Sequence, residues 1–310
     1  MNNPPATASS ENQSKLPRNI DHIIDESWMR RLPGVSVHDW NSEVRMRYLQ
    51  AGSGPPLLLL HGLLGYSFSW RYNLLPFSQF ATVYAPDLPG TGYSERVLNL
   101  DTDLTVRAEH MLCFMDAMGM EHASILGTSL GGALAAMLAL LCEKKHHGRI
   151  RNLILVDPVN PWSRHGQQFT RIAATAMGSL TLRYSFPAMK RMQRIFLARM
   201  YGDPKRISPG TMEGYTAPLD HPQTIDYALS VVRTWHSNLR KLNTAYEELG
   251  KMRTLLIWGD RDRAVIAKSA YELQKRLPNS ELVMLKGVGH LPYEEAPDEF
   301  NEAVRRFLTS

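Results

Sequence analysis

Residues 123–135 read ASILGTSLGGALA and predict a strand, a tight turn and a helix in direct succession. The residues before Gly127 form a short apolar run, and those after Ser129 form an unbroken helix-forming segment. Ser129 stands between Gly127 and Gly131, and a serine on a sharp strand-to-helix turn needs neighbours without a Cβ atom to avoid the adjoining backbone. The stretch therefore indicates a serine whose hydroxyl is exposed at the edge of a sheet.

Several further apolar runs predict a mostly parallel sheet. The runs at 57–60, 153–156 and 255–258 are continuous, as expected of strands covered on both faces, and helical patterns separate them. Alternating residues over 35–50 predict an antiparallel hairpin at the sheet edge. Because the carboxyl ends of parallel strands share one edge, we expect a site made from the polar residues that follow the runs: His61, Asp87, Ser129, Asp157, Asp262 and His290.

Ser129, Asp262 and His290 follow one another in chain order, with the serine turn in the middle of the chain. In this order, and in spaced motifs over about residues 32–308, the sequence resembles the α/β-hydrolase family. The resemblance implies an α/β fold with an eight-stranded, mostly parallel sheet, helices on both faces and a helical cap inserted after the sixth strand. It also implies a Ser-Asp-His triad and no cofactor.

The expected organisation has three parts. Residues 1–20 are rich in Asn, Pro and Ser and predict a flexible N-terminal tail. Residues 21–157 and 251–310 are expected to form the α/β-hydrolase core domain. The interval 158–250 is too long for a connection and carries helical patterns of its own, which predicts a helical cap, or lid.

The three residues of the expected triad have distinct roles. Ser129 is a poor nucleophile unless a base takes its proton, and His290, in the glycine-containing stretch 287–290, is the best candidate for that base. A carboxylate must hold the imidazole in the correct tautomer, and the resemblance assigns this role to Asp262. Asp157 remains an alternative acid, because some family members place their acid after the preceding strand. Asp260 is expected to organise its turn by accepting backbone N–H groups.

The oxyanion of a tetrahedral intermediate needs backbone donors that are already in place. By resemblance, these are the amides of Leu63 and Leu130. His61 is expected to anchor its loop. Residues 90–92 lack the third glycine of a dinucleotide fingerprint, so no nicotinamide cofactor is expected. Cys142, His146 and His147 lie at a helix C-terminus, where the helix dipole stabilises histidine, and we expect no metal site there.

Two apolar stripes mark the expected lid. One comprises Met189, Met192, Phe196 and Met200, with Lys190, Arg191, Arg194 and Arg199 largely opposite; the other comprises Ile225, Leu229, Val232, Trp235 and Leu239. Residues 158–202 contain seven Lys and Arg and no Asp or Glu. We interpret this region as a solvated lid face over an apolar acyl pocket, with contact to a membrane surface as the alternative. Candidate pocket-lining residues are Trp162, Phe186 and Tyr215.

Composition limits the remaining classes. The chain has 310 residues, of which 44% are hydrophobic, enough for a large core. The longest apolar stretch, 131–142, is too short to span a bilayer, and the first 20 residues lack the apolar region of a signal peptide, which favours a cytoplasmic protein without stable membrane insertion. The net charge of +5 without a nucleic-acid motif indicates solubility rather than nucleic-acid binding. A monomer or a homodimer is expected.

The serine at position 129 decides between reaction classes within the family. Haloalkane dehalogenases and epoxide hydrolases of this family carry aspartate there. C–C bond hydrolases of the family share a tryptophan directly after the histidine, where this chain has Leu291. Aminopeptidases of the family tend to carry tryptophan directly after the nucleophile, where this chain has Leu130. We expect a carboxylesterase that acts on a small-molecule ester with a small to medium, largely apolar acyl group through an acyl-enzyme. The alternatives are a lactonase, thioesterase, amidase or C–C bond hydrolase on the same triad, or a ligand receptor with vestigial turnover.

Overall fold

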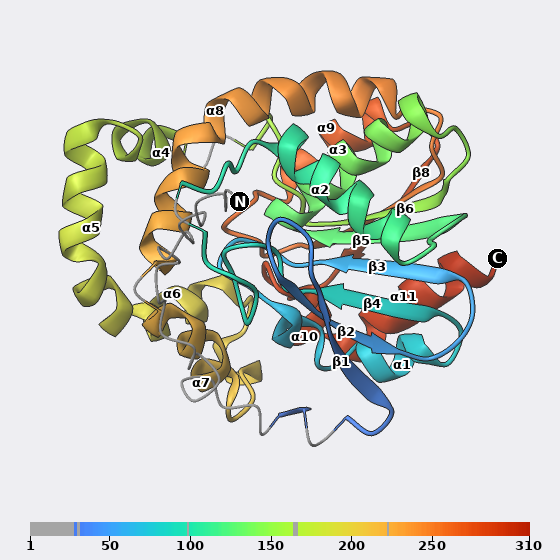
Figure 1. Ribbon diagram of the computed structural model, residues 1–310, viewed down its shortest axis with the longest axis horizontal. Helices are drawn as coiled ribbons and strands as arrows, with labels where there is room; N and C mark the ends of the chain where they lie inside the picture. Colours follow the sequence, from blue (N-terminus) through green and yellow to red (C-terminus); the bar gives the residue numbers. More distant parts are fainter. Residues whose placement is uncertain (1–27, 30–31, 98, 164–166, 222) are drawn as a thin grey trace, which may run out of the picture.

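An eight-stranded sheet runs through the centre of the molecule in the order β1-β2-β4-β3-β5-β6-β7-β8 (Figure 1). The computed structural model describes residues 28–29, 32–97, 99–163, 167–221 and 223–310; the expected tail, 1–20, lies outside them. The strands are β1 (Val35–Trp40), β2 (Met46–Ala51), β3 (Pro56–Leu60), β4 (Thr82–Pro86), β5 (Ala123–Thr128), β6 (Ile150–Val156), β7 (Thr254–Gly259) and β8 (Ser280–Leu285).

The sheet is mostly parallel, as predicted. β1 pairs with β2, and β2 with β4, in antiparallel register, whereas β3 to β8 are parallel to β4 and to one another. In β3, Leu58 and Leu60 belong to one core and Leu57 and Leu59 to the other, because successive side chains of a strand point to opposite faces. This alternation explains why the run is apolar throughout.

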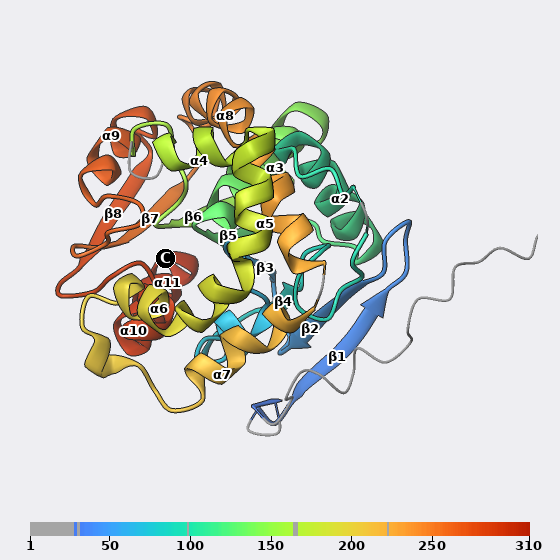
Figure 2. The same cartoon turned by 90° about the vertical axis from the view of Figure 1, so that its left-hand side faces the viewer.

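Helices cover both faces of the sheet (Figures 1 and 2). One face packs against α2 (Leu104–Ala117), α3 (Leu130–Lys145), the second half of α8 (Thr224–Glu248) and α9 (Lys268–Arg276). The other face packs against η2 (Ser67–Trp70), α1 (Leu74–Ser78), α10 (Pro292–Glu295) and α11 (Pro297–Thr309).

Residues 158–250 join β6 to β7, and we call them the helical insert. The segment contains α4 (Gln167–Ala173), α5 (Ala176–Arg191), α6 (Gln193–Met200), η3 (Pro204–Arg206), α7 (Thr211–Thr216), η4 (Ala217–Asp220) and α8. It is helical, as expected, and its status as a separate lid domain stays a prediction. None of the described helices is both long and apolar enough to cross a membrane.

The first apolar stripe of the insert does not face inward as expected. Met192 and Phe196 are 48% and 39% exposed, and the helix is interrupted between Arg191 and Gln193. Met189, together with Lys190 and Arg191, lies outside the described side chains. The assumption of one continuous helical face was therefore wrong, because the break resets the direction of the side chains. The second stripe, on α8, is buried or half-buried along its length, as expected of an inward face.

Two adjacent carboxylates fasten the insert to the core. Glu294 accepts hydrogen bonds from the hydroxyls of Tyr201 and Tyr215 in the insert, and it pairs with Arg71 of the core at 2.5 Å. Glu295 accepts the N–H groups of Gly202 at 2.9 Å and Asp203 at 2.8 Å. Both glutamates are 5% exposed, so these bonds are protected from water. The junction after α6 is thus firmly held.

Candidate active site

Ser129 occupies the turn between β5 and α3 with φ 52° and ψ −118°. This backbone conformation is rare for a residue with a side chain and costs on the order of 1–3 kcal/mol. A Cβ atom on Gly127 would lie 2.2 Å from the Gly131 carbonyl oxygen, and one on Gly131 would lie 2.2 Å from that of Leu60. The glycine spacing is therefore a packing requirement of the turn, which confirms the strand–turn–helix prediction.

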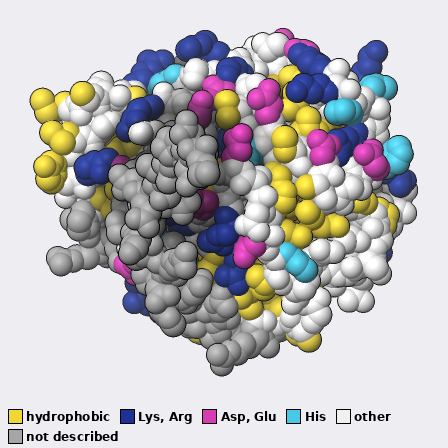
Figure 3. Space-filling view, viewed as in Figure 1, with side chains coloured by type: hydrophobic (Ala, Val, Ile, Leu, Met, Phe, Trp, Pro, Cys, Tyr) yellow, Lys and Arg dark blue, Asp and Glu magenta, His cyan; other side chains and the backbone are white. Residues whose placement is uncertain are grey.

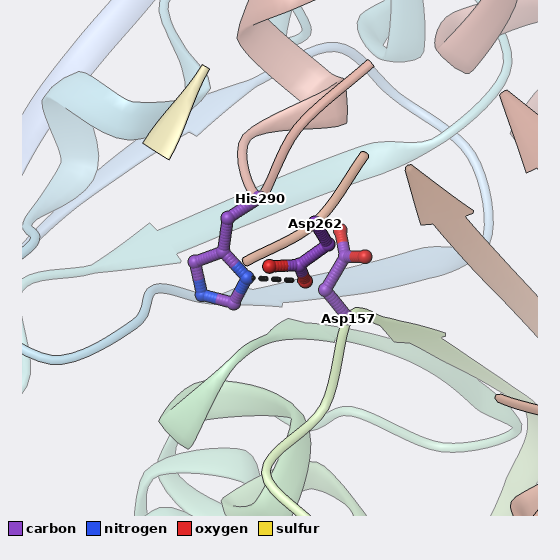
Figure 4. Close-up of side chains that lie close together, drawn as sticks. All are labelled: Asp157, Asp262 and His290. Atoms are coloured by element: carbon purple, nitrogen blue, oxygen red, sulfur yellow. Dashed lines mark hydrogen bonds and ion pairs between the residues drawn. The ribbon is translucent and has the colours of Figure 1, made fainter. Parts of the chain in front are cut away.

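His290 and Asp262, the expected base and acid, form a hydrogen-bonded pair (Figure 4). His290 Nδ1 lies 2.7 Å from Asp262 Oδ2, and both residues are buried. The other oxygen, Asp262 Oδ1, accepts the N–H groups of Ala264 at 2.7 Å and Val265 at 3.0 Å. The turn after β7 therefore holds the Asp262 side chain through one oxygen while the other contacts the imidazole.

Asp157, the alternative acid, lies beside Asp262 and makes no hydrogen bond to His290 (Figure 4). Its Oδ1 accepts the Gly259 N–H at 3.1 Å, and its Oδ2 has no hydrogen-bond partner among the described residues. Burial, followed by the charge of Asp262, raises the pKa of Asp157 well above its usual value. Two adjacent buried carboxylates cannot both ionise easily, so Asp157 holds the proton.

Asp157, Asp262 and His290 are also the residues whose geometry is nearest to that of a metal site. One possible ligand atom from each lies within 4.8 Å of the others. The 2.7 Å separation of His290 Nδ1 from Asp262 Oδ2 is that of a direct hydrogen bond. We interpret this contact as a hydrogen bond between the two side chains.

Ser129 Oγ makes no hydrogen bond with any described residue, so the contact between the expected nucleophile and base is not formed. Catalytic hydrogen bonds are often long without substrate and shorten when it binds. Ser129 does lie against the loop that holds one expected oxyanion donor, because a Cβ atom on Gly62 would be 3.2 Å from Ser129 Cβ. Leu63 follows Gly62. Leu130 is the first residue of α3, where an N–H has no acceptor within the helix.

His61 anchors this loop, as predicted. Its Nε2 accepts the Leu88 N–H at 3.0 Å and lies 3.1 Å from Thr91 Oγ1, and its Nδ1 lies 2.9 Å from the Gly62 carbonyl oxygen. Burial lowers the pKa of His61 to about 3, so the ring is neutral. Its role is to fix the loop.

Two further aspartates at the strand ends are structural. Asp87 accepts the N–H groups of Ser67 at 2.7 Å and Tyr93 at 2.8 Å, and so holds the loop after β4. Asp260 accepts the Gly287 N–H at 2.7 Å. The prediction that Asp260 organises its own turn was therefore wrong: the N–H group that it accepts belongs to the loop after β8, and Asp262 accepts the N–H groups of Ala264 and Val265 after β7.

The loop that carries His290, residues 286–291, contacts the end of α6. The sequence did not indicate this contact. His290 donates its N–H to the Met200 carbonyl oxygen at 2.6 Å, and Gly289 donates its own to Glu295 Oε2 at 2.7 Å. A Cβ atom on Gly289 would lie 2.1 Å from the Met200 oxygen, so only glycine allows this approach. The one signal for Glu295 was the pair of acidic residues soon after His290.

Two of the three expected pocket-lining residues have other contacts. Tyr215 donates to Glu294 at 2.7 Å and packs edge-on against Phe68. Trp162 packs against Tyr246, and the Arg276 guanidinium lies 3.9 Å from its ring centroid. Phe186 is half-buried in α5. These contacts do not test whether the side chains line a pocket, so the expected lining stays a prediction for all three residues.

Comparison with known proteins adds to this geometry. A family model described as alpha/beta hydrolase fold matches residues 55–297. The 2-hydroxymuconate semialdehyde hydrolase of Pseudomonas putida is 29% identical over 271 residues, covering 83% of this chain and 88% of that protein. The 2-hydroxy-6-oxo-6-phenylhexa-2,4-dienoate hydrolase of Comamonas testosteroni is 26% identical over 276 residues, covering 86% and 92%.

Solved structures show the same fold at lower identity. An alpha/beta hydrolase fold protein from Burkholderia ambifaria superposes with a TM-score of 0.72 at 24% identity, covering 86% of this chain and 96% of that one. The haloalkane dehalogenase DatA from Agrobacterium tumefaciens C58 gives 0.76 at 18% identity, covering 89% and 97%. With the family model matching most of the chain, the protein belongs to the α/β-hydrolase fold family.

Proposed function

We propose that the protein is a serine hydrolase that cleaves carboxylic esters of small to medium, largely apolar acyl groups. Membership in a hydrolase superfamily supports a hydrolase activity. The observation that carries the finer proposal is the buried 2.7 Å bond between His290 and Asp262, at the same sheet edge as the Ser129 turn. Together, these groups are a nucleophile, a general base and a carboxylate that orients the base.

In the proposed reaction, Ser129 Oγ attacks the ester carbonyl carbon while His290 Nε2 takes its proton. Asp262 stabilises the imidazolium that forms. The N–H groups of Leu63 and Leu130 bind the oxyanion of the tetrahedral intermediate. His290 then gives the proton to the departing alkoxide, and a water molecule activated by the same imidazole hydrolyses the acyl-enzyme and regenerates Ser129.

The test is Ser129→Ala, measured with p-nitrophenyl butyrate. We expect kcat to fall by at least about a thousandfold while thermal unfolding is unchanged, because the substitution removes only the nucleophilic oxygen. The matched control is Ser36→Ala, which alters an exposed serine on β1 and is expected to keep full turnover. A Ser129→Ala variant that retains more than about a tenth of the turnover would exclude Ser129 as the nucleophile.

The acyl preference is tested with a series of p-nitrophenyl esters. Each added methylene buried in an apolar pocket contributes about 0.8 kcal/mol, so kcat/KM is expected to rise about fourfold per carbon. The rise is expected to end at about four to eight carbons, when the pocket is full. An increase that continues to long chains would contradict the small-to-medium range and favour a lipase.

A second candidate is hydrolysis of a C–C bond, favoured by the two relatives named for that reaction. Leu291 argues against this reaction, because C–C bond hydrolases of the family share a tryptophan at that position. Loss of the ultraviolet-visible absorbance of 2-hydroxymuconate semialdehyde would report this activity. A kcat/KM at least about tenfold above that for p-nitrophenyl butyrate would move the assignment to C–C bond hydrolysis.

A further inference from the structure

The outermost helices of the insert carry exposed apolar side chains. In Figure 1, α5 and α6 lie at the left of the molecule, and in Figure 2, which shows that side, α5 lies in front of the sheet. Met177, Leu180 and Tyr184 of α5 are 75%, 51% and 78% exposed, and their spacing places them on one face of the helix. Met192, which precedes α6, is 48% exposed, and Ile195 and Phe196 of α6 are 54% and 39% exposed.

Basic side chains accompany this apolar surface. Figure 3 shows hydrophobic side chains and Lys or Arg side chains beside one another at the left of the molecule. Residues 158–202 of the sequence hold seven Lys and Arg and no Asp or Glu. One of these charges, Arg183 of α5, pairs with Asp226 of α8. Exposed apolar groups beside Lys and Arg are typical of helices that lie in a membrane interface.

A groove beside α6 collects three arginines. Its volume is about 410 Å³, and Arg194, Arg199 and Arg263 line it together with Ile195. None of these arginines forms an ion pair with a residue in the described part of the chain. All three arginines are exposed, and the planar donor pattern of a guanidinium group matches the oxygens of a phosphate.

We propose that the outer face of α5 and α6, defined by Met177, Leu180, Tyr184, Met192, Ile195 and Phe196, docks on an anionic membrane surface, with a lipid phosphate in the Arg194–Arg199–Arg263 groove. Charge complementarity favours this occupant over a second copy of the chain. A two-fold interface would bring two sets of unpaired arginines together, and like charges in an interface oppose binding. The proposal does not rest on ester hydrolysis, because docking is measured without turnover.

The test is sedimentation of the full-length protein with phosphatidylcholine vesicles, with and without phosphatidylglycerol, at low and high salt. Wild-type protein is expected to bind only the vesicles that contain phosphatidylglycerol, and to leave them at high salt. Failure to bind these vesicles at low salt, or equal binding to pure phosphatidylcholine, would overturn the proposal.

Two triple variants distinguish the effect of the groove arginines on vesicle binding from the effect of the net charge. Arg194→Gln, Arg199→Gln and Arg263→Gln together are expected to weaken binding about 100-fold, at about fivefold per charge. The control combines Lys145→Gln, Arg151→Gln and Arg306→Gln, which removes the same charge from exposed positions on α3, β6 and α11. It is expected to weaken binding by less than about threefold. If the two variants lose the same amount of binding, only net charge matters, and the proposal that the groove binds a lipid phosphate is wrong.

The apolar part is tested with Leu180→Ser and Tyr184→Ser combined. This variant is expected to weaken binding about tenfold or more at low salt, because interfacial affinity scales with buried apolar area. Circular dichroism and thermal unfolding, both unchanged from wild type, establish that each variant is folded. If light scattering shows a wild-type dimer that the Leu180→Ser, Tyr184→Ser variant converts to a monomer, the face is a self-association surface and the membrane proposal is wrong.

Discussion

The ends of β6 and β7 each carry a buried aspartate, and the two differ in how many backbone N–H groups they receive. Asp262, after β7, accepts two backbone N–H groups and bonds to His290 at 2.7 Å. Asp157, after β6, accepts one N–H group at 3.1 Å, and its second oxygen has no hydrogen-bond partner among the described residues. The N–H groups of the following residues thus hold Asp262 in contact with the imidazole, whereas Asp157 makes no such contact.

The largest effect is expected from Asp262→Asn, which removes the charge but keeps the shape. With an amide in place of the carboxylate, His290 is held in the wrong tautomer, and kcat for p-nitrophenyl butyrate is expected to fall about 10⁴-fold. The control is Asp260→Asn, the same change two residues away at a side chain that only accepts the Gly287 N–H. A greater loss from Asp157→Asn than from Asp262→Asn would reverse the comparison and make Asp157 the catalytic acid.

Glu295 extends the comparison of buried carboxylates, because it accepts more backbone N–H groups than either aspartate. The three donors are Gly202, Asp203 and Gly289. Glu295→Ala leaves these donors unsatisfied at a buried site, and we expect it to lower the free energy of unfolding by about 3 kcal/mol. The measurement is urea unfolding, with the exposed Glu299→Ala as the control, for which the change is expected to be below about 0.5 kcal/mol. Equal stability of the two variants would mean that water replaces Glu295 easily.

Asp157→Asn gives a smaller effect that depends on pH. The pKa of Asp157 is raised in the folded state, so above its ordinary value of 3.8 the folded protein holds a proton that the unfolded chain has lost. The contribution of Asp157 to stability is therefore complete below that value and falls as pH rises toward the folded pKa, by up to about 1.4 kcal/mol per pH unit. Asparagine does not titrate, so the Asp157→Asn variant does not lose stability in this way as pH rises.

The stability of Asp157→Asn relative to wild type is accordingly expected to increase between about pH 4 and 7. Urea unfolding of both proteins at several pH values in this window measures the difference. Parallel pH profiles would mean that Asp157 does not bind the proton in the folded state. At neutral pH, kcat of the variant is expected to stay within about tenfold of wild type, since Asp157 makes no hydrogen bond to His290.

Local sterics made part of this site predictable. The Ser129 turn follows from the spacing of Gly127 and Gly131, because a Cβ atom at either position would meet backbone. The edge that gathers the polar residues follows from the parallel strands. The distinction between Asp157 and Asp262 could not be read from the sequence, because it depends on which N–H groups the folded loops turn toward each carboxylate.

The outward face of the insert also escaped prediction. A helical stripe shows which residues share a face but not which way the face turns, and the break after Arg191 separates the residues assigned to one stripe. Glu294 and Glu295 look like exposed charges in sequence, whereas both are buried because α10 packs under the insert. In each case the missing information is tertiary contact between segments far apart in the chain.

The single carboxylate of Glu295 grips two segments at once, the loop after β8 at Gly289 and the insert at Gly202 and Asp203. The loop that carries His290 and the segment that follows α6 therefore share one buried anchor. A substitution that removes this carboxylate is expected to loosen both segments together, and His290 with them.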